Sequence, residues 1–184
     1  MAKKKQNRKD LRKKLITLAI FLVKLNLLAV PLYAIIYYNI SFEPLQNIIA
    51  SISFYLLKIF GYGFALDGHT LYTFSGDNFI QVNISWDSAG WKSLYILSAL
   101  VVATPAAAWK RKIGFLVWAL PAMFAINIAR ITTTIIASLS YGPENFGKIF
   151  DFLHLFLWSS VSIATVIGLW YVFLKTEKDN IREK

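Results

Sequence analysis

Residues 113–138 read IGFLVWALPAMFAINIARITTTIIAS, and Arg130 is the only charged residue among them. A helix of this length is about 39 Å long at ~1.5 Å rise per residue, which exceeds the ~30 Å hydrocarbon core of a bilayer. The stretch therefore predicts a membrane-spanning helix. An ionisable residue at membrane depth is costly and points to a functional site, so Arg130 is the first candidate site residue.

The composition of the chain is that of an integral membrane protein. Of its 184 residues 57% are hydrophobic, and the mean hydropathy is +0.51, so we expect one all-α membrane domain. The net charge is +10, but most of the basic residues gather at the two ends and in one short loop. A nucleic-acid binder would spread them over a folded face, so we expect no nucleic-acid partner. Cysteine is absent, which rules out a disulfide, a thiolate metal site and a thiol nucleophile; we expect no cofactor or metal.

Basic clusters beside the apolar stretches predict the topology. Loops rich in Lys and Arg stay in the cytoplasm, and the clusters here lie in residues 1–14, 109–112 and 175–184. Both termini are therefore expected inside, as the basic tails 1–14 and 175–184. Four spans satisfy this arrangement in a multi-pass protein of the cell membrane, namely residues 15–38, 89–108, 113–138 and 150–174.

The segment between the first two spans is expected outside the membrane. Residues 44–61 carry apolar side chains at helical spacing with polar residues between them, which is an amphipathic pattern. A crossing here would place two basic clusters on opposite sides, so we expect an amphipathic helix along the outer membrane surface. Residues 62–85 alternate apolar and polar positions around turn sequences such as Asp67-Gly68. They predict a small extracytoplasmic β-meander.

In this topology, three polar residues lie at about the same depth in the membrane. Ser88 lies just before the outer end of the second span. Arg130 follows Lys112 by 18 residues, or about 27 Å of helix, which brings it to the outer leaflet. His154 enters the last span from outside and lies roughly 6 Å deep. Their convergence predicts an active site that faces out of the cell.

Two further polar residues are placed to support this site. Asn127 precedes Arg130 by three residues, and Asp151 precedes His154 by three; residues at this spacing share a helix face, so each could orient its partner. Each main residue also has a plainer interpretation. The arginine could reach the headgroups, the histidine could be a packed residue, and the serine could cap a helix.

These residues resemble the exosortase/archaeosortase family of membrane protein-sorting enzymes. The segment DSAGWKS, which begins at Asp87, is similar to the family motif in which a Cys, a small residue and a Gly begin a spanning helix. The segment NIARI, residues 127–131, is similar to the Asn-x-x-Arg segment of the family, and His154 resembles its histidine. The resemblance covers roughly residues 45–175, with matching order and approximate spacing.

The resemblance has one departure at the reacting atom. Ser88 stands where the family has its nucleophilic Cys, and Ala89 stands where Ser or Thr is usual. The chain is therefore either a natural variant that uses a hydroxyl or a protein altered to remove the thiol, which would be an inactivated form.

The resemblance implies a cysteine-type sorting transpeptidase. Its substrates are secreted proteins with a C-terminal tail made of a short motif, a membrane helix and a basic cluster, and the cleaved chain passes to a lipid or other acceptor. Ser88, His154 and Arg130 are the implied catalytic residues. His154 suits the general base because an unperturbed imidazole titrates near neutrality. Arg130 stays cationic and suits a developing oxyanion or a substrate carboxylate; Asn127, Asp151 and Asp87 would support them.

Two other function classes remain open. An intramembrane serine protease would use Ser88 and His154 for simple hydrolysis and would leave a free carboxylate. A non-enzymatic membrane scaffold would use Arg130 and His154 to bind anionic lipid headgroups, and their replacement would then change lipid binding but no cleavage.

Overall fold

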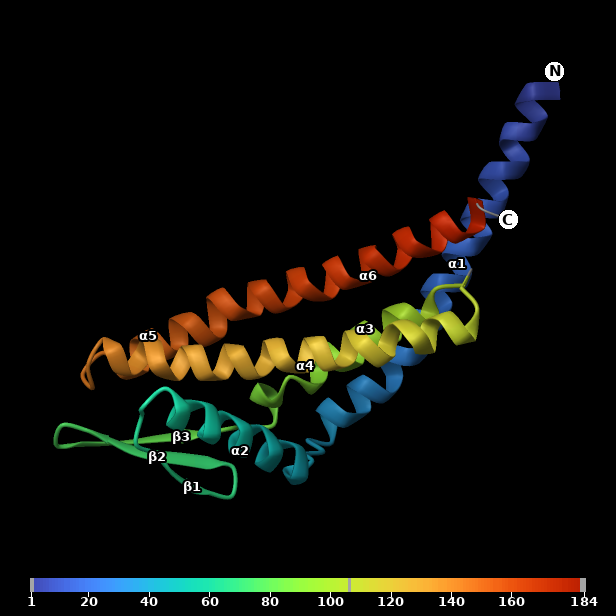
Figure 1. Cartoon of the computed structure of the whole chain (residues 1–184). Coiled ribbons are helices and arrows are strands. Elements are labelled where there is room, and N and C mark those ends of the chain that lie inside the picture. Colours follow the sequence, from blue (N-terminus) through green and yellow to red (C-terminus); the bar gives the residue numbers. More distant parts are fainter. Residues whose placement is uncertain (1, 106, 183–184) are drawn as a thin grey trace.

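The computed structural model describes residues 2–105 and 107–182 and is mainly helical (Figure 1). The α-helices are α1 Ala2–Tyr37, α2 Glu43–Ile59, α3 Trp91–Ala103, α4 Trp109–Ser140, α5 Phe146–Asp151 and α6 Trp158–Arg182. A 3-10 turn, η1 Asp87–Ala89, precedes α3, and a π-helical segment, η2 Phe152–Leu157, joins α5 to α6. The strands are β1 Ala65–Asp67, β2 Thr70–Ser75 and β3 Asn78–Asn83.

Three helical stretches are long and apolar enough to cross a membrane. They are Leu11–Tyr37 in α1, Trp109–Ser140, which is α4, and Phe146–Glu177 from α5 into α6. The expected all-α membrane protein with a small sheet is confirmed at this level. Helix α1 starts well before the expected span because the Lys- and Arg-rich tail consists largely of good helix formers.

The helix within the expected span 89–108 is shorter than the other three. Helix α3 has 13 residues, or about 20 Å, which is less than a hydrocarbon core, so its crossing stays a prediction. Two residues beyond its C-terminus, Thr104 and Ala107, are buried. Thr104 is 6% exposed and its hydroxyl accepts a hydrogen bond from Trp170 Nε1 at 3.3 Å. Lys112 Nζ donates to the carbonyl of Val102 at 2.7 Å. Irregular backbone is tolerated at membrane depth where protein groups satisfy it in this way.

The three strands form the expected meander. The sheet is antiparallel in the order β1-β2-β3, and two-residue turns at Gly68-His69 and Gly76-Asp77 join the strands. Both turn glycines have positive φ, +56° and +60°, a conformation that glycine adopts without steric cost. Leu71 and Val82 point from one face into the protein, whereas Phe74 and Phe79 are 71% and 56% exposed on the other face.

Helix α2 packs against protein along one face. Gln46, Ile49, Ala50, Ser53 and Leu57 are the buried residues of that face, and α4 and the sheet lie against it. Of the apolar positions expected to meet the membrane, Ile49 is buried, but Ile48 and Ile59 are 52% and 77% exposed on the opposite face. The helix therefore divides its apolar residues between the protein and an outward face. Whether that face lies on the membrane stays a prediction.

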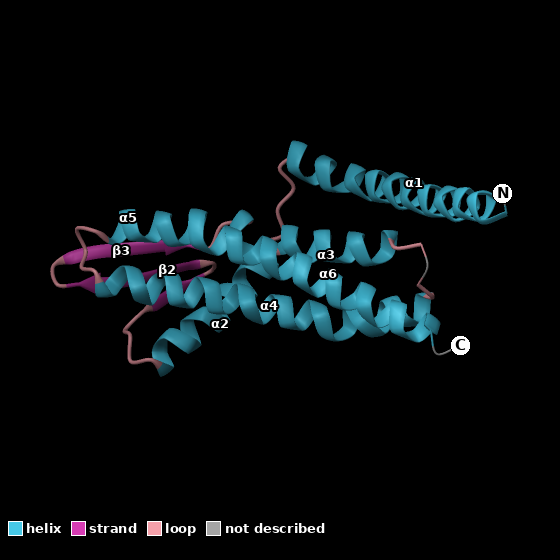
Figure 2. Cartoon of the chain, turned by 90° about the horizontal axis from the view of Figure 1, so that it is seen from above, coloured by secondary structure: helices cyan, strands magenta, loops and turns pink. Residues whose placement is uncertain are grey.

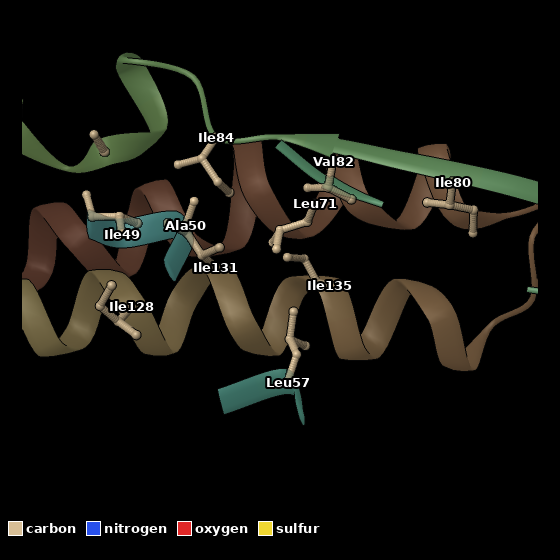
Figure 3. Close-up of a cluster of buried hydrophobic side chains, with 11 residues drawn as sticks. Ile49, Ala50, Leu57, Leu71, Ile80, Val82, Ile84, Ile128, Ile131 and Ile135 are labelled. Carbon is tan, nitrogen blue, oxygen red and sulfur yellow. The ribbon is translucent and has the colours of Figure 1, made fainter. Parts of the chain in front are cut away.

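Two hydrophobic clusters follow one another along α4. One is built from α2, the sheet, the η1 turn and the second half of α4 (Figure 3). The other joins α3, the first half of α4 and α6 within the helix bundle. Figures 1 and 2 show the sheet and α2 gathered at one end of that bundle, away from the C-terminus. Ser88, next to Ala89 of the first cluster, lies where the sheet passes into α3.

Candidate active site

Ser88 lies on the η1 turn, in the short link between β3 and α3. The turn closes through the Ser88 amide, which donates to the Ser85 carbonyl at 3.0 Å and to the Ser85 hydroxyl at 3.2 Å. Gly90 ends the turn in the left-handed conformation, with φ +76°, and α3 begins at the next residue. Ser88 is thus held by a tight backbone turn and is half-buried.

The structure brings Ser88 and His154 together from distant parts of the chain. Ser88 Oγ and His154 Nε2 are 3.2 Å apart, within hydrogen-bond distance. A nucleophile beside an imidazole is the arrangement that general-base activation requires. The Ser85 hydroxyl lies 2.9 Å from Ser88 Oγ on the other side. Sequence reasoning missed Ser85; its only signal is that a Ser just before a helical turn can accept a hydrogen bond from an amide of that turn.

Arg130 and Asn127 both contact the backbone of the same serine. Arg130 Nη2 donates to the Ser88 carbonyl at 2.7 Å, and Asn127 Nδ2 donates to it at 3.3 Å. Both side chains are nearly buried, 8% and 9% exposed. Their three-residue spacing on α4 does place them on one face, as the sequence predicts. The guanidinium therefore holds the turn that carries Ser88, and its contact is with the carbonyl rather than with Oγ.

Three buried N–H donors around this turn have no hydrogen-bond partner in the described part of the chain. They are Arg130 Nε and the indole nitrogens of Trp86 and Trp91. The two indoles flank Ser88 in sequence and stack at 5.0 Å between ring centroids. Buried donors are rarely left unpaired in folded proteins. Three unpaired N–H donors are therefore buried close to Ser88, and a ligand oxygen would have to enter beside the turn to pair with them.

An aromatic stack positions the imidazole of His154. Its ring lies 5.5 Å from that of Phe150 and nearly parallel to it, at 12°, and Phe150 stacks in turn on Phe146. His154 lies in the π-helical segment η2, and such segments occur often at functional sites. This stack, one turn earlier on the same helix, orients the ring.

Asp151 and Asp87 do not contact the Ser88–His154 pair. Asp151 is exposed, and in the described residues no hydrogen bond or ion pair joins it to His154. A π-helical segment begins directly after Asp151, and the supporting role of this carboxylate stays a prediction. Asp87 forms a surface ion pair with Lys92 at 2.7 Å, with its side chain 72% exposed, an interaction of little energetic weight.

An apolar cavity of about 590 Å³ begins at the end of the candidate site. It lies between α3 and α4 and is lined by Trp91, Leu94, Tyr95, Ser98, Leu120, Pro121 and Phe124. Its position suits an apolar ligand or chain that approaches Ser88 from the bundle. Among the described residues, no three His, Cys, Asp or Glu side chains gather as a metal site would require.

Replacing Gly90 with alanine is expected to destabilise the protein by about 2–4 kcal/mol, through backbone strain and a steric clash. The backbone has positive φ, and an added Cβ would lie 2.5 Å from Asn127 Cγ. Relief would move Asn127 away from the Ser88 carbonyl. The midpoint of thermal unfolding in detergent measures the effect. Gly114→Ala is the control, because nothing lies within 4 Å of its added Cβ and alanine favours a helix by up to about 1 kcal/mol. Equal stability of the two variants would contradict this account.

One family of known proteins matches most of the chain. The family model for transmembrane exosortases matches residues 12–171. No curated protein and no solved structure matches the chain.

Proposed function

The chain belongs to the transmembrane exosortase family, and from this premise we propose that it is a membrane-embedded peptidase or transpeptidase. Its substrates in this proposal are secreted proteins with a C-terminal sorting tail. The observation that carries the proposal is the 3.2 Å contact between Ser88 Oγ and His154 Nε2. The two residues come from separate helical segments and meet beside an unusually rich set of hydrogen-bond donors.

The reaction proposed is an acyl transfer. The side chain at position 88 attacks a backbone carbonyl of the substrate, and His154 Nε2 takes its proton. The scissile C–N bond then breaks, the departing amine receives the proton from His154, and the substrate stays bound as an acyl-enzyme. A lipid or other acceptor next attacks the acyl carbon and gives its proton to His154. The bond from the acyl carbon to the side chain at position 88 breaks, and His154 returns the proton to that side chain. A hydroxyl is a weaker acid than a thiol, so activation of Ser88 depends strongly on His154.

Arg130 is proposed to act mainly through the backbone of the turn. Its 2.7 Å bond to the Ser88 carbonyl holds the turn in the conformation that presents Oγ to the imidazole. Its Nε is buried and has no hydrogen-bond partner among the described residues, so a substrate oxygen that enters beside the turn would supply that partner. Charged donors that are fixed before the reaction stabilise developing negative charge without reorganisation.

The proposed orientation places both termini in the cytoplasm and the site outside. The basic residues of 109–112 and of the segment after Leu174 lie at one end of the bundle, and such clusters favour the cytoplasmic side. Arg130 lies about 27 Å further along α4 than Lys112, close to the thickness of the hydrocarbon core. The chain then crosses the membrane four times, provided that α3 and the residues directly beside it span the bilayer as one segment.

Simple proteolysis is the second candidate. The residue present at position 88 is a serine beside a histidine, which is the nucleophile–base pair that a serine protease uses. Hydrolysis would leave a free carboxylate on the product, whereas transfer would leave a modified C-terminus.

The test uses a tagged secreted reporter with a membrane-helix and basic-cluster tail, coexpressed with the full-length chain. We expect loss of the tail and a product mass above that of the free carboxylate by the mass of the acceptor. The control is the Ser88→Ala variant, which should leave the tail intact. A product with a free carboxylate would favour the protease. Tail loss that persists in both Ser88→Ala and His154→Ala would overturn both enzyme proposals, and unchanged tails with altered lipid binding would favour the scaffold.

A further inference from the structure

Strand β3 has one edge that no other strand covers. The sheet order β1-β2-β3 leaves β3 hydrogen-bonded on one side only in the described chain, and Figure 2 shows β3 along the margin of the sheet. The Ile84 amide donates to the His69 carbonyl at 2.9 Å, so Ile84 and His69 extend the hydrogen-bond ladder between β3 and β2 by one residue pair. Because hydrogen bonding alternates along an antiparallel pair, the amides of Phe79, Gln81 and Asn83 and the carbonyls of Phe79 and Gln81 face the free edge. The Asn83 carbonyl already accepts a hydrogen bond from the Ser85 amide at 3.1 Å.

This edge lacks the features that usually protect exposed strands. Native sheets guard their edges with charged side chains, proline, bulges or very short strands. Strand β3 reads NFIQVN over six residues, with no charge and no proline. Its outward residues are exposed. The free edge is therefore a regular row of donors and acceptors that another extended chain can pair with.

The free edge leads directly into the candidate active site. Asn83 ends the strand, and Ser88 follows only five residues later on the η1 turn. The link between them is fixed from both sides. Gln46 Nε2, itself 6% exposed, donates to the Ile84 carbonyl at 2.9 Å, and the Ser85 hydroxyl contacts the Ser88 amide and Oγ. A chain laid along β3 would thus be held in a constant relation to Oγ.

We infer that the free edge of β3 binds the substrate as an added strand and so delivers its scissile carbonyl to Ser88. The inference rests on the proposed function and names how that site recognises its substrate, which is through the main chain of an extended segment. Strand addition draws its affinity from main-chain hydrogen bonds, so one edge can accept different sequences. A substrate whose C-terminal part lies in the membrane would run parallel to β3, since β3 itself runs toward the bundle.

Gln81 offers a variant that changes the edge and spares the sheet. The backbone amide of Gln81 points away from β2. Gln81→Pro therefore removes a donor from the free edge and keeps the hydrogen bonds between β2 and β3. Proline is tolerated at such edge positions. We expect release of the reporter tail to fall about tenfold or more, with an unchanged unfolding midpoint. Phe74→Ala is the control, because it changes an exposed side chain of β2 and keeps every amide of the free edge. Its rate of tail release should stay within about twofold of that of the unaltered chain.

Hydrogen exchange tests the same inference even if the proline variant folds poorly. Hydrogen exchange at the Gln81 and Asn83 amides is followed in Ser88→Ala, with and without the reporter, and we expect slower exchange when the reporter is bound. Normal tail release by a well-folded Gln81→Pro variant, or unchanged exchange, overturns the strand-addition inference alone. Tail release that is independent of Ser88 and His154 removes the proposed function instead. A dimer that Gln81→Pro converts to a monomer would show that a second copy of this chain occupies the edge, which also overturns the inference.

Discussion

In the tail-release assay, the Ser88→Cys variant is expected to cut the reporter on the order of 10²-fold faster than the unaltered chain. The physical reason is that a thiol ionises more readily and is a much stronger nucleophile near neutral pH. Position 88 is already within 3.2 Å of the imidazole that would take the proton. In this cysteine background, His154→Ala should lower the rate by about 10²–10⁴-fold, the usual contribution of a positioned general base.

The matched control for the new thiol is Ser93→Cys. Ser93 is also half-buried and lies on α3 close to the turn, but it does not contact His154 in the described structure. Its replacement should leave the rate unchanged. If Ser88→Cys instead lowered the rate of an active chain, the site would be adapted to a hydroxyl, and the serine protease would become the better account.

Loss of the Arg130 side chain is expected to have the second largest effect. Arg130→Ala removes a charged donor from the Ser88 carbonyl, which should cost about 1.5–3 kcal/mol of stability. It should also lower tail release by about 10²–10³-fold, in the range seen when a donor at a reacting centre is removed. Arg130→Lys should recover little, because an ammonium cannot reproduce the planar, forked guanidinium. The unfolding midpoint and the rate in the Ser88→Cys background measure the two effects.

Variants of Asn127 and Lys148 are the controls for Arg130→Ala. Asn127→Ala removes a longer and neutral hydrogen bond to the same carbonyl, so its effect should be smaller. The double variant Arg130→Ala with Asn127→Ala should be non-additive, since both side chains serve one acceptor. Lys148 is an exposed cation on α5, and Lys148→Ala should change neither quantity. An Arg130→Ala variant with full stability and full rate would remove the role assigned to the guanidinium.

Much of this architecture can be predicted from local sequence because its causes are local. A long apolar stretch needs a helix in a bilayer, where backbone groups must bond within the segment. Turn glycines with alternating residues between them indicate a meander, and the three-residue spacing of Asn127 and Arg130 places them on one helix face. The depth of Arg130 follows from counting helical rise from the basic cluster. The same rule predicts that Asp151 orients His154; the helix changes to a π-helical segment between these two residues, and this supporting role stays a prediction.

The sequence by itself determined the membrane class, the helices and meander, and three polar residues that the structure brings together at Ser88. Only the tertiary structure decided which atoms of those residues meet. It turned the Arg130 guanidinium to the Ser88 carbonyl, added Ser85, stacked His154 on Phe150 and left the β3 edge open beside the site. The physical reason is range: periodicity and hydropathy are set by neighbours along the chain, whereas hydrogen-bond partners depend on how distant elements pack in three dimensions.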